Sequence, residues 1–113
     1  MKEMIILDSP TRIEECVASV NKVMFIFGGK WSLLVFGQLL NGPQRFNELR
    51  RNVGGISTKS LSDILRHFEE NEIVSRVVYP TVPVSVEYSL TDKGRDLQSV
   101  LMEMGQWGGR WEN

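Results

Sequence analysis

The chain contains little of what enzymes and secreted proteins depend on. Its 113 residues include one cysteine and one histidine. A single cysteine cannot form a disulfide within the chain, which fits a reducing compartment such as the cytoplasm. The histidine, His67, lies far along the sequence from Cys16, and potential metal ligands do not cluster at a recognisable spacing. We therefore expect no enzyme, no metal and no cofactor.

Long apolar runs and a targeting segment are also missing. No stretch approaches the roughly 20 apolar residues that a helix needs to span a membrane. The first residues lack the charged start, long apolar core and small-residue cleavage site of a signal peptide. Met4-Ile5-Ile6-Leu7 is short and predicts an arm packed on the body or on a partner. We expect a cytoplasmic protein with no membrane partner.

The chain as a whole has no excess of positive charge, but basic residues gather in one region. The formal net charge is -1 and the sequence pI is about 5.8, which counts against nucleic-acid binding by the chain as a whole. Residues 44–66, however, hold five basic residues against two acidic ones: Arg45, Arg50, Arg51, Lys59 and Arg66 against Glu48 and Asp63. The sequence therefore predicts a mildly basic face on a neutral body.

Residues 44–70 carry two helical patterns that meet at Gly54-Gly55. The first is short, with apolar residues at helical spacing: Phe46, Leu49 and Val53. Ser57 is the candidate N-cap of the second, because its hydroxyl can accept a hydrogen bond from a free amide of the first turn. The second helix then buries one apolar stripe: Leu61, Ile64, Leu65 and Phe68. This arrangement predicts a helix-turn-helix.

The outward face of the second helix carries Lys59, Ser62, Asp63 and Arg66. Arginine and lysine can pair with guanine acceptors, serine is adaptable, and aspartate can accept from cytosine. These residues favour a DNA recognition helix, although an ordinary amphipathic surface helix shows the same pattern. Asp63 can also pair with Lys59 one turn away, which would reduce its role in base readout.

Two helices are predicted before this region. Pro10 suits a first helical position, and one apolar face follows over residues 13–27: Ile13, Val17, Val20, Met24 and Phe27. A second, strongly apolar helix begins at Lys30 and ends at Asn41-Gly42-Pro43, with its apolar residues at Trp31, Leu34, Val35, Leu39 and Leu40. We expect it to be the most buried helix.

Residues 73–90 change to the alternating pattern of strands. Val84, Val86, Tyr88 and Leu90 predict a half-buried strand, paired with residues 73–79 across a proline-containing tip. A hairpin directly after a recognition helix is a wing. Its plausible phosphate or minor-groove contacts are Arg76, Tyr79 and Thr81. The alternative is a hairpin that only covers the core.

The last predicted helix spans residues 91–111 and begins with Thr91 as its cap. One long apolar stripe runs along it: Leu97, Val100, Leu101, Met104 and Trp107. Together with the stripe of the first helix, it predicts a two-fold homodimer built from the first and last helices. The alternative is packing within one chain.

Several motifs follow one another in the order and spacing of a known family. They are Gly28-Gly29-Lys30-Trp31, Leu39-Leu40-Asn41-Gly42-Pro43, Arg45-Phe46-Asn47-Glu48-Leu49-Arg50-Arg51, Gly55-Ile56-Ser57, Val78-Tyr79-Pro80, Pro83, Val86-Glu87-Tyr88-Ser89-Leu90-Thr91 and Lys93-Gly94. Over residues 20–107 the chain thereby resembles the HxlR-type transcriptional regulators, small bacterial proteins related in architecture to the MarR type.

The resemblance implies an α+β, mainly α fold: one winged helix-turn-helix domain with N- and C-terminal dimerisation helices. In residues 1–113 it would comprise an arm and helix (1–27), the helix-turn-helix (44–70), the wing (73–90) and the dimerisation helix (91–111). The implied function is a homodimer that binds inverted repeats in promoter DNA and regulates transcription. By position, the helix over residues 57–70 would enter the major groove, with Ser57, Thr58, Lys59, Ser62 and Arg66 near bases and phosphates. Arg50 and Arg51 would anchor the backbone.

Cys16 has two possible roles. Some relatives of this family carry a cysteine on the first helix that senses quinones, aldehydes or oxidants, usually followed by proline. Here Val17 follows, and the spacing to Gly28-Gly29 is a residue or two longer than the common pattern. The alternative is a small apolar residue buried beside Ile13 and Val17.

Two further functions stay open from the sequence. One is a winged-helix module that binds protein and not DNA, which the neutral net charge favours. The other is a small-ligand protein with a cavity lined by Trp31, Phe27 and Trp107. In a DNA-binding protein the same cavity would be an effector site, and these aromatic residues could equally be plain core.

Overall fold

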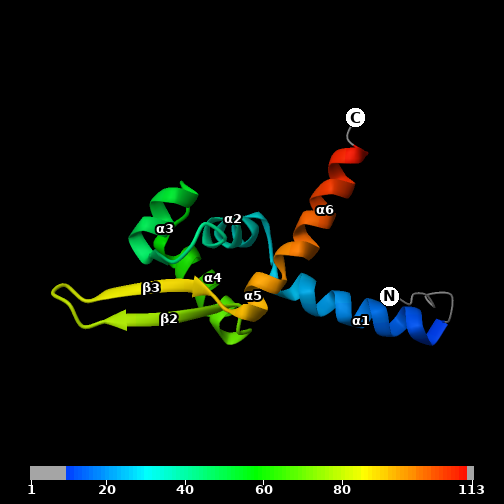
Figure 1. Cartoon of the computed structure of the whole chain (residues 1–113), viewed down its shortest axis with the longest axis horizontal. Helices are drawn as coiled ribbons and strands as arrows, with labels where there is room; N and C mark the ends of the chain where they lie inside the picture. Colours follow the sequence, from blue (N-terminus) through cyan, green and yellow to red (C-terminus); the bar gives the residue numbers. More distant parts are fainter. Residues whose placement is uncertain (1–9, 112–113) are drawn as a thin grey trace.

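The structure is a computed structural model that describes residues 10–111, so the apolar arm at Met4-Ile5-Ile6-Leu7 lies outside the described residues. Figure 1 shows the order of the elements along the chain. They are α1 (Pro10–Ile26), α2 (Lys30–Leu39), β1 (Gln44–Arg45), α3 (Phe46–Val53), α4 (Thr58–Glu70), β2 (Val74–Tyr79), β3 (Ser85–Leu90), α5 (Asp92–Asp96) and α6 (Gln98–Arg110).

The elements form a central body with extensions on opposite sides. Helices α2, α3 and α4 and the base of the sheet make the body, the β2–β3 hairpin extends from one side, and α1 and α6 leave from the other (Figure 1). The molecule measures 58 × 33 × 24 Å along its principal axes. The mainly helical fold and the small antiparallel sheet confirm the predicted winged helix-turn-helix.

The hydrophobic core lies between α2, α3, α4 and the hairpin base. It contains Ile26, Val35, Phe36, Leu39, Leu49, Ile56, Leu61, Leu65, Phe68, Ile73, Val74 and Leu90. Among the described helices α2 contributes the most buried residues, as expected, but not all the expected ones. Leu34 and Leu40 are exposed, and Phe36 is buried instead. The apolar residues of α2 nearly surround the helix, so the sequence pattern could not select the buried side.

The turn between α3 and α4 forms where the sequence predicts it. Gly54 and Gly55 have φ angles of 76° and 83°, a left-handed conformation that favours glycine. The Ser57 hydroxyl then accepts a hydrogen bond from the Ser60 amide at 3.0 Å, which confirms Ser57 as the N-cap of α4. These residues fix the angle at which α4 leaves the turn.

The sheet has a third strand that the sequence did not reveal. Its order is β1-β3-β2, all antiparallel, with Gln44 opposite Tyr88 and Val74 opposite Leu90. Gln44 is buried, and its side chain donates to the Gln38 carbonyl at 2.6 Å and accepts from Asn52 at 2.9 Å. A strand of two residues is too short to show an alternating pattern, so the hairpin alone was predicted.

The hairpin is less buried than its alternation predicts. Leu90 is buried at the base, the other residues of β3 are only half-buried, and Val84 is exposed. The strand is half-buried as predicted, but its polar and apolar residues are covered to a similar degree beyond the base. The outer part of the hairpin extends past the core (Figure 1).

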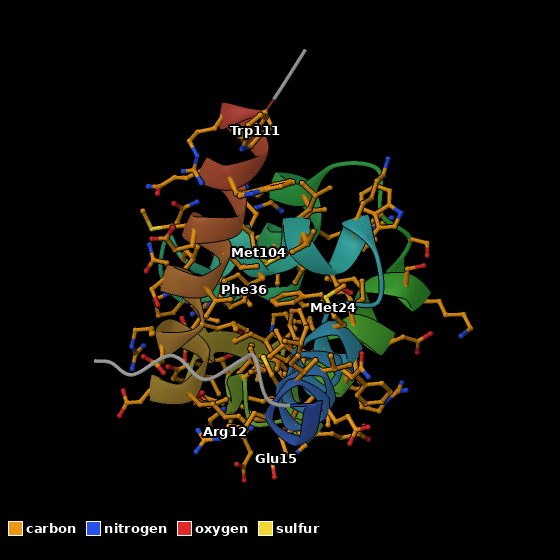
Figure 2. The ribbon with its side chains drawn as sticks, turned by 90° about the vertical axis from the view of Figure 1, so that its right-hand side faces the viewer. Arg12, Glu15, Met24, Phe36, Met104 and Trp111 are labelled. Atoms are coloured by element: carbon orange, nitrogen blue, oxygen red, sulfur yellow. The ribbon has the colours of Figure 1, made fainter. Side chains whose placement is uncertain are left out.

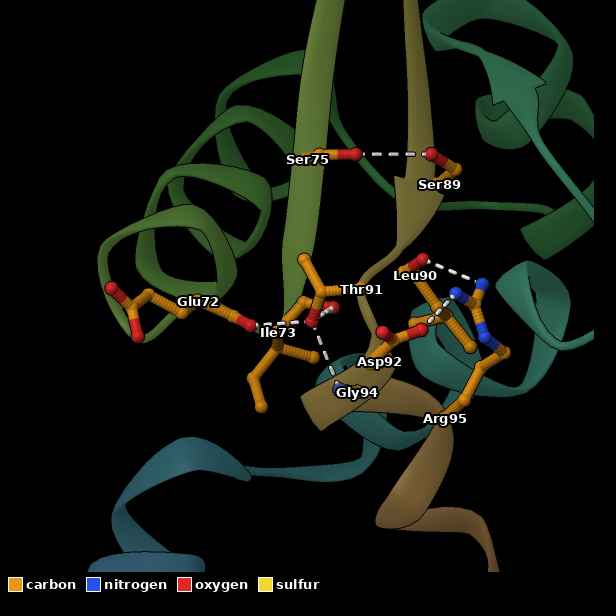
Figure 3. A network of polar contacts seen from close by, with 9 residues as sticks. All are labelled: Glu72, Ile73, Ser75, Ser89, Leu90, Thr91, Asp92, Gly94 and Arg95. Carbon is orange, nitrogen blue, oxygen red and sulfur yellow. Dashed lines mark hydrogen bonds and ion pairs between the residues drawn. The ribbon is translucent and has the colours of Figure 1, made fainter.

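The predicted C-terminal helix is two helices, α5 and α6, separated at Leu97. The Leu97 amide bonds to the Gly94 carbonyl three residues back, so α5 ends in a tight turn. Thr91 caps α5 as predicted, because its hydroxyl accepts from the Gly94 amide at 3.0 Å. The same hydroxyl donates to the Glu72 carbonyl at 2.6 Å, which ties α5 to the hairpin base (Figure 3).

Gly94 is buried against the start of β2. A methyl group at this position would overlap the Ile73 carbonyl oxygen, which itself accepts from the Thr91 amide at 3.0 Å. Gly37, in contrast, faces open space on α2. The two glycines allow a matched test of packing against helix propensity.

We predict that Gly94→Ala lowers the free energy of unfolding by about 1–3 kcal/mol, because the methyl group forces α5 away from the hairpin. Gly37→Ala should raise it by roughly 0.5–1 kcal/mol, since alanine favours an exposed helix position. Urea unfolding at one fixed protein concentration measures both. An unchanged midpoint for Gly94→Ala would contradict this packing.

Candidate nucleic-acid interface

The outward face of α4 carries a three-residue charge cluster. Lys59 Nζ lies 2.9 Å from one Asp63 carboxylate oxygen, and Arg66 Nη2 lies 3.3 Å from the other. Lys59 and Arg66 are exposed, and Ser62 beside them is half-buried. Asp63 therefore holds the two cations along one side of the helix, and its pairing with Lys59 is confirmed.

The hydrogen bond from Lys59 is the main reason that the pKa of the Asp63 carboxyl lies below its ordinary value, and the charge of Arg66 adds to the effect. Asp63 is consequently ionised at neutral pH. Its contribution to stability is present above the ordinary carboxyl pKa and is lost as the pH falls through the lowered value. The cluster keeps its arrangement throughout the neutral range.

The N-terminus of α4 opens into a basic cleft of about 420 Å³, lined by Arg50, Arg51, Gly54, Gly55, Ile56 and Ser57. Arg50 Nε donates to the Ile56 carbonyl at 3.4 Å, which connects α3 to the turn before α4. Two guanidinium groups beside free helix amides suit an anion such as a DNA phosphate. The predicted backbone anchors Arg50 and Arg51 thus share one cleft with Ser57.

Two of the predicted contact residues of the wing form hydrogen bonds within the wing itself. The Tyr79 hydroxyl donates to Glu87 across the hairpin at 3.1 Å, a bond that raises the pKa of Tyr79. Thr81 Oγ1 donates to the Pro83 carbonyl at 2.8 Å within the tip. Tyr79 and Thr81 are still exposed, so both can meet a ligand from these fixed positions.

Arg45 belongs to this surface but was absent from the predicted site residues. Its guanidinium carbon lies 5.9 Å from the centre of the Tyr79 ring, in cation–π range. It reaches this position because β1 pairs with β3, placing Arg45 opposite Glu87. Only its membership of the basic run could have suggested the role from the sequence, since the strand that carries it leaves no pattern.

A groove of about 810 Å³ runs between the start of α3 and the wing tip, and Arg51 and Thr81 are among its lining residues. Arg51 also lines the cleft at the α4 N-terminus. One continuous surface therefore joins Ser57, Arg50, Arg51 and the wing tip. Thr58, at the first position of α4, is exposed beside this cleft, and Arg76 is exposed on β2.

Cys16 lies apart from this surface. It is exposed on α1, which extends from the opposite side of the body to the wing (Figure 1). In the single chain it is therefore not the buried core residue of the alternative interpretation. Any influence of Cys16 on the α4 surface must pass through α1.

The apolar faces of α1 and α6 are exposed in the single chain. The exposed residues are Ile13, Val17, Val20 and Met24 on α1 and Val100, Met104 and Trp107 on α6. Figure 2 looks along α1 and shows α6 rising beside it, with Arg12 and Glu15 on the lower side of α1 and Met24 on the upper side. Leu97 and Leu101, at the start of this stripe, are packed against the core. Packing within one chain thus accounts for only the first part of the stripe.

The three aromatic residues considered for a ligand cavity lie in different surroundings. Phe27 packs edge-on against Phe36 and Phe68, with ring centres 5.4 and 6.1 Å away. Trp31 packs partly against the core, and Trp107 is 61% exposed. Phe27 and Trp31 are therefore partly buried residues that pack against the core. Among the described residues no helix is long and apolar enough to cross a membrane, and no three His, Cys, Asp or Glu residues are grouped to hold a metal ion.

The fold and the basic face of α4 define a winged helix-turn-helix protein of the DNA-binding class. Residues 26–113 match the family described as HxlR-like helix-turn-helix. The chain belongs to this family, as its motifs predicted, and the family consists of transcriptional regulators and is not a known enzyme family.

Several relatives support this assignment. YkvN of Bacillus subtilis strain 168, an uncharacterised HTH-type transcriptional regulator, is 46% identical over 84 residues, which cover 74% of this chain and 71% of YkvN. YodB, an HTH-type transcriptional regulator of the same strain, is 42% identical over 86 residues, covering 76% of this chain and 77% of YodB.

Solved structures agree with the sequence comparisons. The reduced form of YodB superposes with a TM-score of 0.74 at 35% identity, covering 96% of this chain and 95% of that one. The redox regulator HypR in its oxidised form superposes with a TM-score of 0.73 at 39% identity, covering 84% of this chain and 98% of the HypR chain. This chain is therefore a helix-turn-helix transcriptional regulator, and DNA binding is supported over the protein-binding alternative.

We predict that Asp63→Asn raises the affinity of the protein for scrambled duplex DNA. It should thereby reduce the ratio between the affinities for specific and for scrambled DNA. The change removes a negative charge from the face and releases Lys59 and Arg66 to pair with phosphates. The slope of log affinity against log salt concentration should become steeper by the equivalent of about one or two phosphate contacts. Fluorescence anisotropy at several salt concentrations measures both quantities. The matched control is Asp96→Asn on α5, which removes the same charge away from α4. Equal effects of the two substitutions would contradict this role.

Proposed function

We propose that this regulator binds inverted-repeat promoter DNA as a homodimer, with α4 in the major groove and the wing along the backbone. The observation that carries the proposal is the outward face of α4, where Asp63 holds Lys59 and Arg66 side by side. Ser57, Thr58 and Ser62 complete the base-facing set at the capped end and along the same side. The proposal assigns no catalytic role to the chain.

The phosphate contacts fall to residues around this helix. Arg50 and Arg51 in the cleft at the α4 N-terminus would hold one stretch of backbone, and Arg76, Tyr79 and Thr81 on the wing would hold another. Contacts of this kind set the register of a protein on DNA and make binding sensitive to salt. Base contacts from α4 would supply the discrimination, at about 1–3 kcal/mol each.

The exposed stripes of α1 and α6 support the homodimer. Their apolar residues would otherwise stay in water, and burial stabilises by about 25 cal/mol per Å² of apolar surface. Helices α1 and α6 both extend on the side of the body away from the wing (Figure 1). A dimer also presents the mildly basic face twice, which offsets the slightly negative charge of the whole chain.

The test is anisotropy of a duplex from the region upstream of the gene against a scrambled duplex, at two salt concentrations. We expect preferential, salt-sensitive binding, weakened roughly 5-fold to 150-fold in Lys59→Ala and Arg66→Ala, in line with 1–3 kcal/mol for a base contact. Arg12→Ala, which removes a cation from α1, is the matched control and should bind like wild type. Wild-type affinity in both α4 variants would refute this docking, and no binding to either duplex by a folded dimer would favour a protein-binding module.

We also propose that Cys16 senses electrophiles or oxidants. It is exposed on a helix proposed to form the dimer interface, so modification there can alter how two copies pair. One of the solved structures is that of diamide-treated YodB, and HypR is described as a redox regulator. In a homodimer, the two Cys16 thiols can form one disulfide between subunits and transfer two electrons and two protons to diamide. A quinone would instead form a carbon–sulfur bond with the Cys16 thiolate.

We predict that diamide lowers the affinity of wild-type protein for the DNA that the reduced protein binds, by roughly 5-fold to 150-fold, a usual range for coupling between sites. Cys16→Ser should bind the same DNA and show no response. Non-reducing electrophoresis should show a linked dimer for wild type alone. A diamide response that persists in Cys16→Ser would remove Cys16 from this role.

A further inference from the structure

Within the part of the chain that the structure describes, helix α1 buries side chains against the body only in its last turn. From Arg12 to Phe25 every described side chain is exposed except that of Val23, which is half-buried. Ile26 is 9% exposed and belongs to the core, and Phe27 just after the helix packs against it. The angle between α1 and the body therefore depends on the contacts of a few residues.

The connection after α1 does not fix this angle. Gly28 and Gly29 follow Phe27, and no atom described lies within 4 Å of a Cβ added to either glycine. A glycine pair in open space permits many backbone angles. The orientation of α1 must come from side-chain contacts, both those of Ile26 and Phe27 with the core and those that reach α1 from other elements.

His67 of α4 makes such a contact. Its Nε2 lies 2.9 Å from the Phe25 carbonyl oxygen, across 42 residues of sequence. The Phe25 and His67 rings also meet edge-on, with their centres 4.9 Å apart and their planes at 76°. Phe25 lies in the last turn of α1, where carbonyl groups lack partners within the helix. His67 thus supplies a helix end with a donor from the recognition helix.

The partners of the two ring nitrogens of His67 indicate which nitrogen donates. The Phe25 carbonyl can only accept, so His67 Nε2 carries the proton. Asn71 Nδ2 donates to the His67 carbonyl at 2.8 Å and lies 3.5 Å from His67 Nδ1, which can then accept. Asn71 therefore orients the ring toward α1.

We propose that His67 is a positioning residue that fixes the angle between α1 and α4, and thereby the half-site spacing that the regulator accepts on DNA. The inference rests on the proposed homodimer. If α1 and α6 pair with their copies, the angle at the end of α1 contributes to the position of each α4 relative to the dimer interface. Recognition helices in such dimers must match half-sites about one helical turn, or 34–36 Å, apart.

Small angular errors matter at this hinge. With 17 residues, α1 is about 25 Å long, so a rotation of about 10° at its end displaces the far end by roughly 4 Å. The rise along one strand of DNA is about 3.4 Å per base. Loss of the His67 contact should therefore let the dimer accept spacings that differ by a base pair or more.

The first test selects duplexes from a library of random sequence. Wild type should enrich inverted repeats of one spacing. His67→Leu, which has no donor, should enrich the same half-site sequence at two or more spacings. His67→Gln should restore the single spacing, because its amide can donate to the Phe25 carbonyl. Glu70→Gln, an exposed change one turn further along α4, is the matched control. One unchanged spacing in His67→Leu, or failure of His67→Gln to restore it, overturns the proposal.

The second test measures the geometry without DNA, using spin labels in a Cys16→Ser background. Glu15→Cys places a label on α1, opposite its apolar stripe, and Ser60→Cys places one on the exposed side of α4. In His67→Leu we expect an unchanged distance between the two α1 labels and a broader distribution between the two α4 labels. An equally narrow α4 distribution overturns the inference while the dimer stands. The absence of any distance between α1 labels in wild type overturns the dimer itself, and with it the spacing role.

Discussion

The structure depends on the burial of one stripe of α4. Leu61, Leu65 and Phe68 are buried against α2, α3 and the hairpin base, and each such side chain contributes roughly 1.5–3 kcal/mol. Turning the helix by one residue, about 100°, would bring charged side chains into the core. The stripe therefore decides which residues face outward. It directs Lys59 and Arg66 to solvent and His67 to the end of α1, so the proposed DNA contacts and the proposed subunit geometry both depend on this helix.

A chain with a net charge of -1 can bind DNA because the charge is distributed unevenly. Arg50 and Arg51 stand beside the positive end of α4, while Asp63 keeps Lys59 and Arg66 in a fixed arrangement. The carboxylate also limits attraction to phosphate in general, because it occupies both cations. Such a face favours discrimination between sequences over raw affinity, and a dimer that presents it twice can still bind tightly at a matched pair of half-sites.

Local patterns in the sequence were enough to predict the elements that a single segment specifies. The stripe of α4, the Ser57 and Thr91 caps and the glycine turn all depend on residues within a few positions of one another. Contacts between segments far apart in the sequence could not be predicted from these local patterns. Strand β1 is two residues long, Gly94 packs against the carbonyl of the distant Ile73, and the His67–Phe25 bond joins residues far apart in sequence. For the candidate site, the α4 residues and the Arg50–Arg51 pair followed from spacing and resemblance, whereas Arg45 required the fold to bring it to Tyr79.

We propose that two copies pair through the exposed faces of α1 and α6 and so place two α4 helices on one duplex. The most direct test is the mass of the protein, alone and on a single duplex carrying one selected inverted repeat, measured by light scattering for wild type and for Val17→Glu. A charge in the apolar interface should split the dimer, because an unpaired carboxylate is costly to bury. We expect two wild-type chains with and without DNA, and a Val17→Glu monomer with strongly reduced affinity for the duplex. A wild-type monomer that binds one half-site as tightly as the full repeat, unaffected by Val17→Glu, would contradict it.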